Sequence, residues 1–261
     1  MIYPYHITLL IVCPLVFIAG FVDSIAGGGG LISLPAYIFA GLPIHTAHGT
    51  NKFANSIGTG VAVINYSRSG RVHFPAALAG VIGALPGSWA GTQLALFLSP
   101  RALQICLMII LPLAVIFLLT NKGLSDDIIK KEKPLKQVII ISLCTGLFIG
   151  AYDGFFGPGT GMFITLILAG LARLELVKAA GTTRVINFSS NIASLAAWLI
   201  GGKVLFSLAL PCAFCAVAGN YLGSKLAINK GKKIIRVFII IVAVFLFIRI
   251  SFDLINLGRL P

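Results

Sequence analysis

Acidic residues are scarce in this sequence. Seven Asp and Glu stand against 20 Lys and Arg, and charged residues of both signs make up 10% of the 261 positions. A soluble domain carries about 25% charged residues, so this chain lacks the polar surface that water requires. With 58% hydrophobic residues and a mean hydropathy of +1.01, it is predicted to be an all-α integral membrane protein in a lipid bilayer.

Motifs of several enzyme classes are also absent. The sequence contains no G-x-x-x-x-G-K-[ST] phosphate loop, no G-x-S-x-G nucleophile elbow and no H-E-x-x-H zinc motif. Its glycine clusters follow membrane-like sequence rather than a soluble strand, which excludes a dinucleotide site by context. Its basic residues lie in short loops, without the interleaved aromatics of a nucleic-acid surface. We therefore predict no enzyme, no nucleic-acid partner, no cofactor and no metal.

Cysteine is infrequent, with five residues in the chain. Cys212 and Cys215 form a C-x-x-C inside an apolar run, without a second pair of ligands. Ordinary cysteines in a helix interior are the favoured interpretation. An intramembrane thiol-redox protein is kept as a minor alternative.

What the sequence does contain is a glycine-rich stretch that occurs twice. G-F-V-D-S-I-A-G-G-G-G at residues 20–30 returns as G-A-Y-D-G-F-F-G-P-G-T-G at residues 150–161. Such clusters weaken a helix and expose backbone groups, which in lipid must be satisfied by protein, water or a ligand. Broken helices at matching positions of two repeats are typical of a transporter's substrate site.

The repeat extends beyond these glycines. G-T-N-K-F-A-N at 49–55 matches G-T-T-R-V-I-N at 181–187, and G-S-W-A-G at 87–91 matches G-N-Y-L-G at 219–223, with a constant offset of 132 residues. Such glycine pairs let helices approach closely, so we interpret them as packing positions. The sequence predicts a first membrane repeat at 1–120, a basic cytoplasmic linker at 121–136 and a second membrane repeat at 137–261.

Each repeat is predicted to hold about four to five membrane segments. The apolar runs fall at 6–26, 31–42, 50–66, 74–98, 102–120, 137–156, 162–171, 183–200, 204–224 and 234–255. The runs at 31–42 and 162–171 are too short to span a bilayer, so each is predicted to be half of a helical hairpin with the glycines at its tip. Those tips are expected to meet near the midplane.

The distribution of Lys and Arg indicates how the repeats are related. With an odd number of crossings per half, most basic loops fall on one side, and with an even number they spread over both. The positive-inside rule therefore favours inverted repeats, cytoplasmic basic loops and termini that face outward.

The candidate site combines three features in each half. A helix restarting after the glycine break would offer free N–H groups and its dipole to an anion. The next helix is expected to open with hydroxyl or amide donors and one cation, Lys52 or Arg184, and intramembrane cations are functional by default. The predicted substrate-binding residues are Gly27, Gly28, Gly29, Gly30, Thr50, Asn51, Lys52, Asn55, Gly157, Gly159, Gly161, Thr182, Thr183, Arg184 and Asn187.

The role of Asp23 and Asp153 stays open between two compatible interpretations. Either residue could carry a proton or balance the cations, and either could cap N–H groups at the break. His45 and His48 are spaced for a metal or a proton relay. Their equivalents Val177 and Ala180 are not histidines, which favours a loop or interface role.

These motifs resemble the TauE/SafE family of sulfite-exporter-like proteins, most closely its YfcA-like bacterial branch. F-V-D-S-I-A-G-G-G-G at 21–30, G-T-N-K at 49–52 and Y-D-G-F-F-G-P-G-T-G at 152–161 carry the resemblance, which covers nearly the whole chain. The resemblance implies a multi-pass transporter of the bacterial inner membrane that handles sulfur-containing or organic anions.

We therefore predict a secondary transporter of a small anion, most specifically a sulfur oxyanion or organosulfonate, that works by alternating access. Coupling to protons stays open at this point. A passive anion-selective channel using the same site is the main alternative. The expected partners are the anionic substrate and the lipid bilayer, and a homo-oligomer is compatible with the sequence.

Overall fold

The protein is helical over the residues that the computed structural model describes, which are 4–99, 101–102, 105 and 132–241. The helices are α1 Tyr5–Ala26, α2 Gly30–Phe39, α3 Ile44–Arg68, α4 Phe74–Phe97, α6 Leu135–Phe155, α7 Thr160–Gly170, α8 Leu176–Ile200 and α9 Phe206–Lys230. Residues 232–241 are helical as well. The predicted segments at 102–120 and 234–255 and the linker at 121–136 fall mostly outside the described residues.

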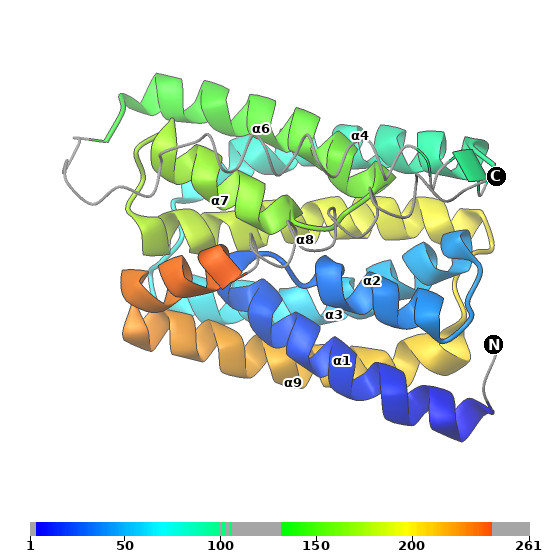
Figure 1. Cartoon of the computed structure of the whole chain (residues 1–261). Coiled ribbons are helices and arrows are strands. Elements are labelled where there is room, and N and C mark those ends of the chain that lie inside the picture. The colour runs from blue at the N-terminus through cyan, green and yellow to red at the C-terminus, as the bar shows by residue number, and fades with distance from the viewer. Residues whose placement is uncertain (1–3, 100, 103–104, 106–131, 242–261) are drawn as a thin grey trace.

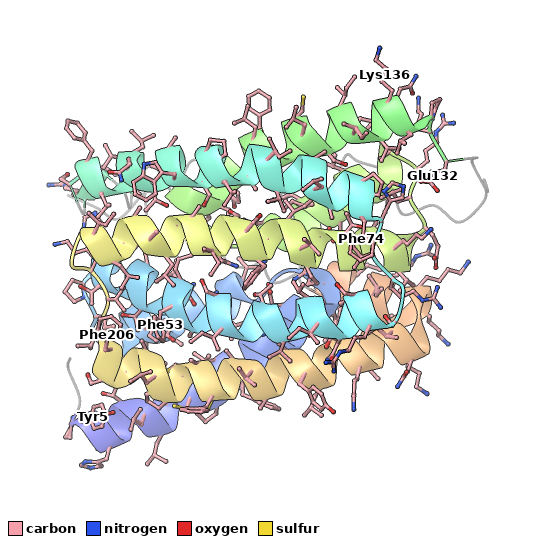
Figure 2. All side chains as sticks on the ribbon, turned by 180° about the vertical axis from the view of Figure 1, so that it is seen from behind. Tyr5, Phe53, Phe74, Glu132, Lys136 and Phe206 are labelled. Atoms are coloured by element: carbon pink, nitrogen blue, oxygen red, sulfur yellow. The ribbon has the colours of Figure 1, made fainter. Side chains whose placement is uncertain are left out.

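The helices form a multi-pass membrane bundle. Four of them, α1, α4, α6 and α9, are long and apolar enough to cross a bilayer. Large apolar side chains on their outer faces are strongly exposed, for example Leu10 at 73%, Phe97 at 89% and Phe214 at 76%. Figure 2 shows such side chains projecting outward around the bundle. Apolar exposure on this scale is typical of a surface that lipid covers.

The more polar helices α3 and α8 occupy the middle of the bundle and run in opposite directions (Figure 1). On one side of them α4 packs against α6 and α8, and on the other side α9 packs against α1 and α3. Phe53 of α3 and Phe206 of α9 lie side by side in Figure 2, with ring centroids 5.5 Å apart. Thus α4 of the first half and α9 of the second half are each packed against helices of the other half.

Glycines explain the close approach of α4 to α6. A Cβ added at Gly87 would lie 2.2 Å from the Leu147 carbonyl oxygen, and one added at Gly91 would lie 2.0 Å from the Ala151 carbonyl oxygen. Gly154 of α6 is equally close to α4. The structure therefore confirms the packing role that the sequence predicts for these glycines, and identifies the partner helix.

The two short helices reverse the chain inside the bundle. α2 returns beside α1 and α7 returns beside α6, so that each pair forms a helical hairpin (Figure 1). The predicted hairpins are therefore present. One detail of the prediction is wrong: α3 begins at Ile44 and α8 at Leu176, so the G-T-N-K and G-T-T-R motifs lie inside these helices instead of opening them. The residues before each motif, 44–48 and 176–180, extend the helix, and all of them are buried or half-buried.

Candidate functional site

The tips of the two hairpins contact each other. The backbone N–H of Met162 donates to the carbonyl oxygen of Gly27 at 3.3 Å, and a Cβ added at Gly27 would lie 2.2 Å from the Gly161 carbonyl carbon. Gly27 has φ 86° and Gly157 has φ 96°, a left-handed conformation that favours glycine. The glycine clusters are therefore required both for the turns and for the contact between the turns.

The first of two buried ion pairs joins α3 to the end of α6. Lys52 Nζ lies 2.7 Å from Asp153 Oδ2, and both side chains are 3% exposed. Lys52 also donates to Asn191 Oδ1 at 2.9 Å, and the Ser190 hydroxyl donates to the same Asp153 oxygen at 2.5 Å. Each charge of this pair thus has a second polar partner, as a buried ion pair requires.

The second ion pair joins α8 to the end of α1. Arg184 Nη1 donates to the Asp23 carbonyl oxygen at 2.6 Å and to Asp23 Oδ2 at 3.1 Å. Asp23 Oδ1 accepts from the Gly29 backbone N–H at 3.1 Å. Asp23 therefore both balances a cation and accepts from an N–H of the hairpin turn, and its role as a proton carrier stays a prediction.

Arg184 differs from Lys52 in how well it is satisfied. Its side chain is fully buried at 0% exposure, yet its Nε and Nη2 have no hydrogen-bond partner in the described part of the chain. A buried donor without a partner costs about 1–3 kcal/mol, and more for a charged group. The edge of the guanidinium that carries Nε and Nη2 can therefore still donate hydrogen bonds.

The two ion pairs are related by the internal repeat. Lys52 is the ninth residue of α3 and Arg184 the ninth residue of α8, and each takes its carboxylate from the other half of the chain. The pairs therefore tie the two halves together at the hairpin tips.

A small polar cavity of about 20 Å³ lies at the tips, which is room for roughly one water molecule. Most of the predicted site residues line it: Asp23, Gly27, Gly30, Asn51, Lys52, Asn55, Asp153, Gly157, Gly161 and Asn187. Thr160 and Asn191 also line it, and the sequence reasoning missed both. The signal for Asn191 was its position one helical turn after Asn187, which places both amides on the same face of α8.

The other predicted residues do not line this cavity. Thr50 Oγ1 accepts from the Leu205 N–H at 3.1 Å and Thr182 Oγ1 accepts from the His73 N–H at 2.9 Å. These two threonines hold the connections that precede α9 and α4. The remaining ones, Gly28, Gly29, Gly159, Thr183 and Arg184, are likewise not among the lining residues. Thr183 accepts from the Thr165 hydroxyl at 3.0 Å. Arg184 contacts Asp23, which lines the cavity, rather than the cavity itself.

A family model described as "Sulfite exporter TauE/SafE" matches residues 12–250. The chain belongs to the TauE/SafE family. The match agrees with the resemblance carried by the two glycine motifs and G-T-N-K. No solved structure matches the chain.

Curated TauE/SafE relatives cover nearly the whole chain. A "Probable membrane transporter protein ORF9" from Sinorhizobium sp. is 36% identical over 91% of this chain and 90% of the relative. A "Probable membrane transporter protein" from Haemophilus influenzae is 34% identical over 91% of this chain and 92% of the relative. "Probable membrane transporter protein YfcA" from Escherichia coli K12 is 32% identical over 90% of this chain and 87% of the relative. The chain is thus similar over its full fold to bacterial proteins named as membrane transporters.

Proposed function

We propose that this protein is a secondary transporter of a small anion, that the anion is a sulfur oxyanion or an organosulfonate such as sulfite or sulfoacetate, and that transport is by alternating access. The observation that carries the proposal is the buried edge of Arg184 formed by the partnerless Nε and Nη2. Nε and Nη2 share one edge of the guanidinium and can bind one oxyanion with two parallel hydrogen bonds. Arg184 does not line the closed cavity and its Nη2 lies against Gly161, so this edge becomes available when the hairpin tips separate. The description of the matching family model, a sulfite exporter, supports the same class of substrate.

The hairpin helices add to this preference for anions. α2 and α7 both begin at the cavity. The Gly29 N–H before α2 donates to Asp23, and the N-cap Gly159 of α7 has no side-chain capping bond. A helix N-terminus carries about half a positive charge, so two of them facing one cavity favour a negative ligand.

The charges of the site support coupling to protons. With every group ionised, Lys52 and Arg184 are balanced by Asp153 and Asp23. A bound monoanion would leave one uncompensated negative charge in a buried site, which is costly. One proton on a carboxylate removes that cost for a monoanion such as hydrogensulfite, and a dianion such as sulfoacetate needs two. We therefore include electroneutral cotransport of protons with the anion in the proposal.

The size of the cavity supports a moving site. A cavity of about 20 Å³ holds roughly one water molecule, whereas a sulfur oxyanion has at least four heavy atoms. Binding therefore requires the hairpin tips to separate. We propose that the halves are inverted repeats that alternate around this site, which the opposite directions of α3 and α8 support (Figure 1).

The orientation that we propose places the basic end of the bundle in the cytoplasm. Arg68 and Lys230 end α3 and α9, and Arg71 pairs with Glu175 at the same end. Lys203 lies at the opposite end, where its carbonyl oxygen contacts the start of α3. The positive-inside rule then puts the start of α3 on the outer side.

A thermal-shift screen of the purified protein tests the proposal. Sulfite, thiosulfate, sulfoacetate, taurine, sulfate and acetate would be added separately at several pH values. An anion that binds the folded state at 100 times its Kd stabilises it by about 2.7 kcal/mol, and we expect this for at least one sulfur anion. If no anion raised the melting temperature, the proposed anion site would be wrong.

Arg184→Lys is expected to weaken that binding by about tenfold or more. Lysine keeps the charge but lacks the planar fork, and losing about 1.4 kcal/mol is already a tenfold change. The matched control is Arg71→Lys, because Arg71 is 45% exposed in a surface ion pair. Equal affinities in the two variants would contradict the role of the Arg184 edge.

Flux measurements separate a carrier from a passive anion-selective channel. In proteoliposomes, a carrier shows saturation and counterflow of labelled sulfite against unlabelled sulfite. A channel gives conductance without counterflow.

Cys212→Ala together with Cys215→Ala is expected to leave transport unchanged. Both residues lie on α9 as free thiols, and neither lines the cavity. Normal sulfite counterflow in the double variant would exclude the thiol-redox alternative, whereas its loss would revive that alternative.

A further inference from the structure

Three titratable side chains share one face of α3. His45, His48 and Lys52 are spaced i, i+3 and i+7, so they lie one above another along the helix. His45 follows Ile44, the first residue of α3, and Lys52 belongs to the buried ion pair. At 1.5 Å per residue the series spans roughly 10 Å. It therefore connects the end of the bundle to the candidate site.

The environment of His48 does not account for an imidazole. The side chain is 2% exposed, and its Nε2 has no hydrogen-bond partner within the described residues. Its ring stacks on Trp198 of α8, with centroids 5.8 Å apart and an interplanar angle of 13°. An apolar ring would fill the same space without burying a bare nitrogen, so packing alone gives no reason for histidine here.

His45 is the next titratable residue toward the surface on this face of α3. It is half-buried, and its Nε2 lies 3.1 Å from the Ala95 carbonyl oxygen of α4. Its ring centroid is 5.9 Å from that of Trp198, so both histidines pack on the same indole. The described residues contain no group of three or more His, Cys, Asp or Glu arranged to hold a metal ion.

The charged neighbours of His48 disfavour a proton that stays on its ring. Its electrostatic partners are Lys52, one turn further into the helix, and His45, one turn back. From α8 it meets Trp198, and Asp153 of α6 lies beyond Lys52. The nearest carboxylate along this line is thus the one that already accepts from Lys52 at 2.7 Å.

We propose that His45 and His48 form a proton relay between the solvent at the start of α3 and the Lys52–Asp153 pair. The inference rests on the proposed anion transport. His45 takes a proton from water and passes one to His48, whose imidazole accepts on one nitrogen and releases from the other. Lys52 gives a proton to Asp153 and regains one from His48. The net change is one proton on Asp153, which breaks its ion pair and leaves the Lys52 ammonium free for the anion.

The relay exists in one half of the chain. Val177 and Ala180 stand at the equivalent positions of α8, and neither side chain can carry a proton. Protons therefore reach the ion pairs from the start of α3, the end that we propose to face outward. This asymmetry makes the outer side the side of proton entry.

His48→Gln in proteoliposomes tests the relay with radiolabelled sulfite as the probe. Glutamine keeps a polar side chain but cannot transfer a proton, and positioned proton-transfer groups contribute about 100-fold or more. We expect accumulation driven by an imposed pH gradient to fall by about tenfold or more, while counterflow at equal pH stays within about twofold of wild type. The matched control is His6→Gln, because His6 is exposed near the start of α1.

The possible results separate the relay from the carrier. Loss of gradient-driven accumulation with intact counterflow supports the relay, since intact counterflow also shows that the variant is folded. Full accumulation in His48→Gln would overturn the relay and leave the carrier standing. Wild-type protein without sulfite counterflow would overturn the proposed sulfite transport and the relay with it. If His48→Gln does not fold, His45→Gln carries the same test at a half-buried position.

Discussion

Lys52→Met is expected to abolish sulfite counterflow and to destabilise the protein strongly. The substitution leaves the carboxylate of Asp153, which is 3% exposed, without its cation and with the Ser190 hydroxyl as its remaining hydrogen-bond donor. Removing one partner of a buried ion pair costs about 3–5 kcal/mol. The melting temperature of the purified variant and its counterflow in proteoliposomes measure the two effects.

A second substitution separates stability from function. Lys52→Met combined with Asp153→Asn removes both charges, so most of the lost stability should return while transport stays absent. The control is Arg71→Met, which breaks the exposed pair with Glu175 at 3.6 Å and should cost about 0–1 kcal/mol. If the single variant melted like wild type, the pair would not be the buried interaction described above.

Gly91→Leu is expected to prevent α4 from packing on α6. An added Cβ would lie 2.0 Å from the Ala151 carbonyl oxygen, and backbone cannot move aside as a side chain can. The cost should exceed the roughly 1–3 kcal/mol of ordinary overpacking. Since α6 ends at Phe155 and carries Asp153 in its last turn, displacing α6 would also pull the carboxylate away from Lys52. The yield of monodisperse protein in detergent and its melting temperature measure the effect.

The neighbouring residue provides the control for this prediction. Ala90 is exposed on the outer face of α4, so Ala90→Leu adds a similar volume toward lipid and should leave yield and melting temperature unchanged. A Gly91→Leu variant with normal yield and transport would show that the close contact between α4 and α6 is not required.

Much of the fold could be predicted from the order of apolar runs and glycines. The run at 6–26 became α1, Tyr5–Ala26, and the run at 74–98 became α4, Phe74–Phe97. Helices buried among other helices were harder to delimit. α3 begins at Ile44 and α8 at Leu176, before the apolar runs at 50–66 and 183–200, so hydrophobicity alone placed both starts too late in the chain.

The site could be predicted in its residues but not in its pairings. Lys52 and Arg184 stood out because a cation in an apolar run is costly. Their partners Asp153 and Asp23 come from the opposite half of the chain, and no local pattern reports a contact over that distance. Thr50 and Thr182 matched the repeat equally well, yet they bond to the connections before α9 and α4. The internal sequence repeat identifies equivalent positions in the two halves, but it does not predict which of these positions line the cavity.

The packing of α9 on α1 and of α4 on α6, helices from opposite halves, bears on how such a protein is synthesised and how it arose. Gly219 of α9 lies against the Phe17 carbonyl of α1. During synthesis α1 therefore cannot pack on α9 until the ribosome has made nearly the whole chain. Folding therefore cannot proceed half by half as each repeat emerges. An ancestor with a single repeat would have lacked this partner within its own chain. Two copies of that ancestor, each packing its α4-like helix against the other copy, would have supplied it. Gene duplication would then have turned contacts between subunits into contacts within one polypeptide.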